Sequence, residues 1–246
     1  MHLEHEDQGE IRILRMQRPP VNALNAELIQ NLDTALAQAM QDESVRVVIL
    51  TGSPGVFSAG LDVREMTRDA AAAQQIVEGF FALQKSLALT EKPIIAAING
   101  HCPAGGTVLS LLCDQRLMVE GDFRIGLNEV QVGLYPGLTI WKIFERLLGF
   151  RRASDLLSRG VMLTPAEALD AGLVDELCAS DALLKRALER AHELLQLPPK
   201  TYLRTRALVR RELMQWYREP GESLEELLAE GWVNDESIAR LRALVR

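Results

Sequence analysis

Glu129 is the residue of this sequence whose surroundings best suit proton transfer. It lies in the stretch Ile125-Gly-Leu-Asn-Glu129-Val-Gln-Val-Gly133, among apolar residues and glycines. Apolar surroundings raise the pKa of a carboxyl group toward neutral pH, where the group can both accept and donate a proton. An isolated glutamate in a loop is more often an ordinary solvated side chain. The pattern alone therefore leaves both interpretations of Glu129 open.

Two glycine-rich segments follow predicted strands, at points where the backbone could meet a ligand. The first runs from Gly52 to Asp62 and the second from Asn99 to Val108. Glycine lets backbone N–H groups come close to a ligand, and the second segment leads into a predicted helix whose N-terminus favours negative charge. The second segment is neither a Walker A loop nor G-x-G-x-x-G, so the nucleotide motifs are not matched. The first segment is equally compatible with a simple turn.

Other catalytic chemistries have less support. His101 and Cys102 are adjacent, and neighbours in sequence rarely present both side chains to one point, so we expect one exposed and one packed residue instead of a nucleophile with its base. The four histidines and three cysteines show no ligand spacing, so no metal site is expected. No G-x-S-x-G nucleophile elbow occurs. The segment from Met16 to Asn25 reads on its own as a rigid connection.

Alternating strands and helices must position these segments. Short β-branched runs predict strands over 8–14, 44–50, 93–98 and 116–119. A stripe of apolar residues at helical spacing predicts a helix between the first two strands, with Leu28, Ile29, Leu32, Leu36 and Met40 on its buried face. Asn25 is placed to cap that helix. Continuous apolar runs are typical of strands covered on both faces, so we expect an α/β fold with parallel strands.

The composition suits a single acidic domain. The chain has 246 residues, 48% of them hydrophobic, and a formal net charge of −7. This balance argues against nucleic acid as the main partner. Three widely spaced cysteines in apolar surroundings indicate buried free thiols in a reducing compartment. The acidic N-terminus resembles no targeting signal, and no run approaches about 18 apolar residues, so we expect no membrane span and a cytoplasmic protein.

The pattern from about Gly137 to Arg246 is mainly helical. Glycines and the pair Pro198-Pro199 interrupt it, and Ser223-Leu-Glu-Glu226 matches a capping box that opens a late helix. We therefore expect a core over residues 1–190 that carries the chemistry, followed by a helical region over 191–246.

Taken together and in order, these segments resemble the enoyl-CoA hydratase/isomerase (crotonase) superfamily over nearly the whole chain. The resemblance is carried by Arg18-Pro with Asn22-Ala-Leu, Phe57-Ser-Ala-Gly-Leu-Asp62, Lys92-Pro-Ile-Ile-Ala-Ala-Ile-Asn-Gly100, the Ala104-Gly-Gly106 loop, Cys113-Asp114, and Leu163-Thr-Pro-Ala-Glu-Ala-Leu-Asp-Ala-Gly-Leu-Val-Asp175. Each piece is weak singly, but the ordered set is specific.

The resemblance implies a crotonase-like spiral of ββα units, with C-terminal helices that build a homotrimer or a hexamer. It implies an acyl-coenzyme A substrate, no separate cofactor, and an oxyanion hole made by the backbone N–H groups of Leu61 and Gly105. Such donors stabilise negative charge on a thioester oxygen, and losing one usually costs about 10²–10³ in rate. The residues implied to bind the substrate are Val21, Ala23, Ala59, Gly60, Leu61, Asp62, Val63, Gly105 and Asn128.

One departure narrows the expected reaction. Hydratases of this superfamily carry a glutamate where this chain has Val108, in addition to the one that Glu129 matches. Val108 cannot transfer a proton, and an apolar side chain works against holding a water molecule. The strings Cys102-Pro-Ala-Gly-Gly106 and Ile125-Gly-Leu-Asn-Glu129 resemble the mitochondrial-type Δ3,Δ2-enoyl-CoA isomerase branch, in which Glu129 would be the single base and Asn128 would lie beside the substrate.

Three alternatives remain open at this point. A hydratase or another acyl-CoA enzyme of the superfamily is the nearest. A non-catalytic acyl-CoA-binding or scaffold protein is the second, although the presence of Glu129 and both glycine-rich loops disfavours it. A serine peptidase with a related spiral fold is disfavoured because no Ser–His–Asp set is evident.

Overall fold

A twisted six-stranded sheet forms the centre of the protein. The computed structural model describes residues 2–229 and 234–244. The sheet has the order β1-β2-β3-β5-β7-β10, in which β1 pairs antiparallel with β2 and the other neighbours are parallel. The strands are β1 (Leu3–Gln8), β2 (Ile11–Met16), β3 (Val47–Thr51), β5 (Ile94–Ile98), β7 (Gln115–Val119) and β10 (Glu176–Cys178).

A second, smaller sheet has the order β4-β6-β8-β9. Its strands are β4 (Gly55–Val56), β6 (Gly100–Pro103), β8 (Ile125–Gly126) and β9 (Met162–Leu163). In the chain, β4 follows β3, β6 follows β5, and β8 follows β7, so each turn of the fold contributes one strand to each sheet and then enters a helix. Both glycine-rich segments belong to this second layer.

The first strand prediction was wrong in its limits. The run 8–14 was expected to be one strand, but it contains the turn of a hairpin between β1 and β2. Gly9 has a φ of +61°, a conformation that glycine adopts without strain. Gln8 consequently pairs with Ile11 across the turn. The other three predicted strands are present with shifted ends.

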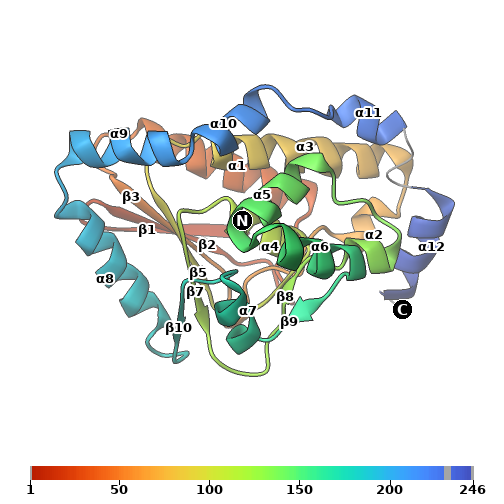
Figure 1. Cartoon of the computed structure of the whole chain (residues 1–246), viewed down its shortest axis with the longest axis horizontal. Coiled ribbons are helices and arrows are strands. Elements are labelled where there is room, and N and C mark those ends of the chain that lie inside the picture. Colours follow the sequence, from red (N-terminus) through yellow and green to blue (C-terminus); the bar gives the residue numbers. More distant parts are fainter. Residues whose placement is uncertain (1, 230–233, 245–246) are drawn as a thin grey trace.

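Helices cover both faces of the large sheet. The helices α1 (Ala26–Gln41) and α3 (Ala70–Ala88) pack together on one face (Figure 1), while α8 (Leu183–Leu195) packs against β3, β5 and β7 from the other. This cover explains why every residue of β3 is buried. The predicted cap is confirmed, since the side chain of Asn25 accepts a hydrogen bond from the N–H of Leu28.

From Leu138 onward the described part of the chain is mainly helical, as expected, apart from β9 and β10. Its helices besides α8 are α5 (Leu138–Leu148), α6 (Phe150–Arg159), α7 (Pro165–Ala171), α9 (Pro199–Val209), α10 (Arg211–Arg218), α11 (Leu224–Ala229) and α12 (Asp235–Leu244). Ser223 and Glu226 form the predicted reciprocal capping bonds. Within the predicted helical stretch, residues 230–233 and 245–246 lie outside the described residues. The division at 190/191 stays a prediction, and α8 spans it.

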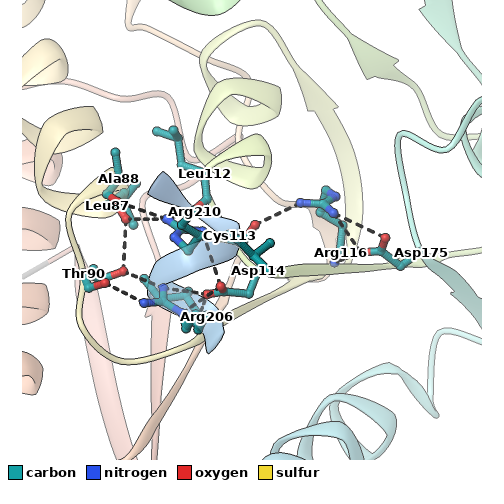
Figure 2. A network of polar contacts seen from close by, with 12 residues as sticks. Leu87, Ala88, Thr90, Leu112, Cys113, Asp114, Arg116, Asp175, Arg206 and Arg210 are labelled. Atoms are coloured by element: carbon teal, nitrogen blue, oxygen red, sulfur yellow. Dashed lines mark hydrogen bonds and ion pairs between the residues drawn. The ribbon is translucent and has the colours of Figure 1, made fainter. Parts of the chain in front are cut away.

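A buried charge network ties the helical region to the core (Figure 2). Asp114, which precedes β7, accepts hydrogen bonds from Arg206 of α9 at 2.8 and 2.9 Å and from the N–H of Ile94 at 2.8 Å. Arg210 lies 3.4 Å from the same carboxylate and donates to the carbonyls of Leu87 and Leu112 at 3.1 and 3.0 Å. These contacts fix α9 and α10 against the ends of α3 and α4 (Gly105–Leu111).

The cysteines and His101 can be compared with the sequence expectations. All three cysteines are free and buried, as predicted. His101 is exposed and Cys102 is fully buried, so the pair is not assembled as a nucleophile and base. Over 2–229 and 234–244, no helix is long and apolar enough to cross a membrane.

Candidate functional site

An apolar cavity of about 270 Å³ lies where the two glycine-rich loops meet the helices. It brings together the predicted site residues Ala59, Leu61, Val63, Gly105, Asn128 and Glu129. The rest of its wall comes from distant parts of the chain: Met66, Phe80, Phe81, Gln84, Pro103, Ala104, Val108, Val132, Leu134, Pro136, Ile140 and Leu241. Among these described lining residues, Glu129 is the one ionisable side chain.

Glu129 begins a short 3₁₀ helix, η1 (Glu129–Val132), and directs its carboxyl group into enclosed apolar space. The residue as a whole is half-buried, but its Oε2 is fully buried and has no hydrogen-bond partner among the described residues. Burial raises the pKa of Glu129 to about 7 and outweighs the opposing hydrogen bond from its own backbone N–H. A carboxyl group with this pKa exchanges protons readily at neutral pH.

The two glycine-rich loops touch each other at Gly60 and Gly105. A Cβ on Gly60 would lie 3.1 Å from the nitrogen of Gly105, so Leu61 and Gly105 are held close together. Leu24 accepts a hydrogen bond from Asp62 and donates one to Gly60, so the intervening N–H of Leu61 points away from Leu24. Neither the Leu61 N–H nor the Gly105 N–H donates to another described residue. The cavity that contains Glu129 is thus bordered by two residues whose backbone N–H groups donate to no described residue.

Buried polar contacts hold the first loop in this shape. Asn22 has a φ of +49° and is fully buried. Its side-chain amide donates to the carbonyls of Val56 and Phe57 at 3.3 and 3.2 Å, and its side-chain oxygen accepts from the N–H of Arg18 at 2.7 Å. The hydroxyl of Ser58 donates back to the carbonyl of Asn22 at 2.8 Å. The segment before α1 is therefore more than the simple connection that its sequence suggests.

The second loop is fixed from the helix that follows it. Ala104 has a φ of +47°, an uncommon conformation for a residue with a side chain. The hydroxyl oxygen of Thr107 accepts a hydrogen bond from the N–H of Gly126 at 3.0 Å, which joins α4 to the strand before Glu129. A Cβ on Gly106 would lie 2.5 Å from the carbonyl oxygen of Ser58, so only glycine allows the two loops to approach this closely.

Comparison with known proteins decides the family. The family model for enoyl-CoA hydratase/isomerase matches residues 6–229. The chain belongs to the enoyl-CoA hydratase/isomerase family. It is 34% identical over 204 residues to human mitochondrial enoyl-CoA delta isomerase 1, covering 82% of this chain and 68% of that protein. It is 33% identical over 231 residues to a probable enoyl-CoA hydratase of Rhizobium meliloti (strain 1021), covering 92% of this chain and 83% of that protein.

The solved structures agree on the fold. The crystal structure of human mitochondrial Δ3-Δ2-enoyl-CoA isomerase matches with a TM-score of 0.90 at 29% identity, over 100% of this chain and 97% of the other. Enoyl-CoA hydratase from Bacillus halodurans matches with a TM-score of 0.86 at 23% identity, a likeness of fold alone. The predicted crotonase fold is confirmed, as is the resemblance of the sequence to the mitochondrial isomerases of this family.

Four predicted substrate-binding residues of this family member lie outside the cavity wall: Val21, Ala23, Gly60 and Asp62. Val21 and Ala23 run beside the first loop, since the N–H of Ala59 donates to the carbonyl of Val21 at 3.0 Å. Val21 is 40% exposed. The carboxylate of Asp62 caps the short helix α2 (Val63–Met66) and lies 2.6 Å from the guanidinium of Arg18. A role for these four in binding coenzyme A stays a prediction.

Sequence reasoning did not find the helical part of the cavity wall. Phe80 and Gln84 of α3, Ile140 of α5 and Leu241 of α12 read in the sequence as ordinary helix residues. One signal was available: Gln84 is a polar residue on the buried stripe of α3, between Phe80 and Leu87.

Proposed function

We propose that this protein is a Δ3,Δ2-enoyl-CoA isomerase, which converts a 3-enoyl-CoA to the trans-2-enoyl-CoA. The observation that carries the proposal is the Glu129 carboxyl group, which has a pKa of about 7 and is the one carboxyl group among the described residues that line the apolar cavity. The identity to human enoyl-CoA delta isomerase 1 supports the same reaction.

In this proposal Glu129 moves one proton between two carbons of the substrate. Its carboxylate takes a proton from C2, and the electron pair of the broken C–H bond forms a C1=C2 double bond while charge collects on the thioester oxygen. The resulting dienolate takes the same proton back at C4, which leaves the double bond between C2 and C3. No water, metal or redox partner enters the balance. A carboxyl group whose pKa lies near neutral pH suits both half-steps.

The backbone N–H groups of Leu61 and Gly105 are the proposed donors to the thioester oxygen. Both residues border the cavity, and neither N–H is used by another described residue. Donors that are already in place stabilise the enolate without reorganisation. Gly105 also begins α4, so the helix N-terminus favours the same negative charge.

The main competing activity is hydration, because the Rhizobium relative named as a probable hydratase is nearly as similar. Hydration needs a group that activates water as well as a group that delivers a proton. Val108 occupies the position of the second glutamate of hydratases and is only 4% exposed. Its side chain makes that part of the cavity apolar, which favours isomerisation over hydration.

The remaining parts of the proposal extend beyond the reacting atoms. Asn128 would lie beside the acyl group, and the segments Val21–Ala23 and Ala59–Val63 would bind the coenzyme A moiety. We place the reaction in the β-oxidation of unsaturated fatty acids in the cytoplasm, with the protein as a homotrimer or hexamer and with no separate cofactor.

The test is to incubate the pure protein separately with 3-hexenoyl-CoA and 2-hexenoyl-CoA. We expect conversion of the first without hydration of the second, and loss of turnover in Glu129→Gln with acyl-CoA binding retained. The exposed Glu91→Gln serves as the matched control. Efficient formation of 3-hydroxyacyl-CoA would instead identify a hydratase, and binding without turnover of either ester would identify an acyl-CoA-binding protein.

A further inference from the structure

Gln84 is a buried polar side chain in the wall of the otherwise apolar cavity. It is 3% exposed and belongs to α3, where its neighbours on the same stripe are Phe80 and Leu87. Apolar side chains such as Val108, Leu134 and Ile140 form most of the cavity wall. A buried amide in such surroundings is retained at a cost unless its donors and acceptors are paired.

The hydrogen bonding of Gln84 is half complete. The hydroxyl of Tyr217 in α10 donates to Oε1 of Gln84 at 3.0 Å. Burial raises the pKa of Tyr217, so the hydroxyl stays protonated and keeps its role as donor. The contact turns the amide oxygen toward α10. No described residue accepts a hydrogen bond from the NH₂ group, which is not among the fully enclosed unpaired atoms and so keeps some access to the cavities that Gln84 lines. The NH₂ group of Gln84 is therefore available to donate a hydrogen bond to a ligand in the cavity that Glu129 also lines.

Beyond Gln84 there is room for more of an acyl chain. A second cavity of about 270 Å³ lies between α3, α5, α10 and α11. It shares Phe81, Gln84, Pro136 and Ile140 with the wall of the first cavity. Gln84 thus belongs to the wall that the two cavities share. In the proposal, the distal part of a longer acyl group lies along this shared wall, where the second cavity also borders the charged side chains Glu78, Lys85, Arg218 and Glu222.

We propose that the Gln84 side-chain amide, oriented by Tyr217, is a specificity-determining donor that selects acyl groups with an oxygen acceptor on the chain. This inference rests on the proposed function, since it names the substrate class of the same site. A plain alkyl chain that passed Gln84 would leave the NH₂ group without a partner, whereas an oxo group would accept from it. Leaving a buried donor unpaired weakens binding by about 10-fold or more.

The test compares the binding of paired coenzyme A esters. The plain ester is 3-decenoyl-CoA, and its partners carry an oxo group at C7, C8 or C9. Dissociation constants are measured by calorimetry in the Glu129→Gln protein, so that no turnover disturbs them. We expect at least one oxo ester to bind about 10-fold more tightly than the plain ester. Equal or weaker binding of every oxo ester would overturn the proposal.

Variants separate recognition from a structural role of the Gln84–Tyr217 contact. Gln84→Met, made in the same Glu129→Gln protein, should bring the ratio of the two dissociation constants close to one, and Tyr217→Phe should lower it because the amide can then rotate. Gln75→Met, on the exposed side of α3, is the matched control and should keep the ratio. If the ratio survives both Gln84→Met and Tyr217→Phe, Gln84 only joins α3 to α10 and the proposal fails.

The outcome is independent of the isomerase assay. A preference for oxo esters in a protein that isomerises nothing would refute the proposed function and uphold the role of Gln84. Isomerisation of 3-hexenoyl-CoA without any preference for oxo esters would do the reverse.

Discussion

Replacing Glu129 by glutamine should make the protein more stable at neutral and alkaline pH. The pKa of Glu129 is about 7 in the folded protein, against 4.5 for the free side chain, because burial disfavours the charged form. Folding therefore costs more when Glu129 is ionised. The difference between the two pKa values corresponds to about 3 kcal/mol. Glutamine has nearly the same shape and no charge, so it removes this cost.

The raised pKa of Glu129 determines the pH range over which the wild type and Glu129→Gln differ in stability. Below about pH 4.5 the carboxyl group is protonated in both states, and the wild type and Glu129→Gln should be equally stable. As the pH rises from about 4.5 to about 7, the wild type should lose up to about 3 kcal/mol of unfolding free energy relative to the variant. Above about pH 7 the difference should stay constant.

Thermal unfolding followed by circular dichroism at pH 4 and pH 8 measures this difference. The variant should melt higher at pH 8 by about 6–12 °C, since 1 kcal/mol corresponds to about 2–4 °C in a chain of this size. The exposed Glu91→Gln should melt like the wild type at both values. A variant that is no more stable than the wild type at pH 8 would refute the buried, destabilised carboxylate and with it the physical basis for Glu129 as the base.

Three further predictions test the chemistry and the scaffold. The kcat/KM for 3-hexenoyl-CoA should rise with pH to a plateau above about 7, because Glu129 accepts the C2 proton only as a carboxylate; a profile that falls over this range would contradict its role. Gly106→Ala should lower kcat about 10²-fold, because its Cβ would lie 2.5 Å from the carbonyl oxygen of Ser58 and would displace the adjacent Gly105 N–H. Gly79→Ala on α3 is the control. Equal rates in the two variants would refute the role of the Gly105 N–H. Asp114→Ala should lower the free energy of unfolding, measured by urea denaturation, by about 3–5 kcal/mol, because Arg206 and Arg210 stay buried without their shared carboxylate. A loss below about 1 kcal/mol would show that the network contributes little to stability.

The parts of the fold that sequence predicted are those with strong local patterns. The continuous apolar run of β3 and the stripe of α1 with its cap at Asn25 were found because burial and capping act within a few residues. The hairpin at Gly9 was missed because β1, Leu3–Gln8, is polar apart from Leu3, so no alternating apolar pattern marks a strand before the turn. The strands of the second sheet were missed for a different reason. They are two to four residues long, too short for any period to register.

The site was predictable in its loops and not in its walls. The sequence shows the glycines that bring Leu61 and Gly105 together and the apolar stretch around Glu129. Whether that glutamate is buried depends on side chains far away in the chain, such as Phe80, Ile140 and Leu241. Their helical patterns predict burial but do not say against what. The resemblance to the crotonase superfamily predicted that the two loops and Glu129 share one site, which local sequence patterns could not do.

One helical turn of α4 bears on both the electrostatics and the reaction class of the site. Gly105 and Val108 are three residues apart, so they lie on the same side of α4, and both border the cavity. The first position supplies a backbone donor, and its chemistry does not depend on a side chain. The second position decides whether a second acid can reach the substrate. In the proposed reaction, valine at this position leaves Glu129 to carry both proton transfers, and its apolar side chain offers little to hold a water molecule. On the proposed mechanism, the side chain at position 108 can change the reaction class while the donor pair stays in place, so similarity to both kinds of relative is compatible with isomerisation.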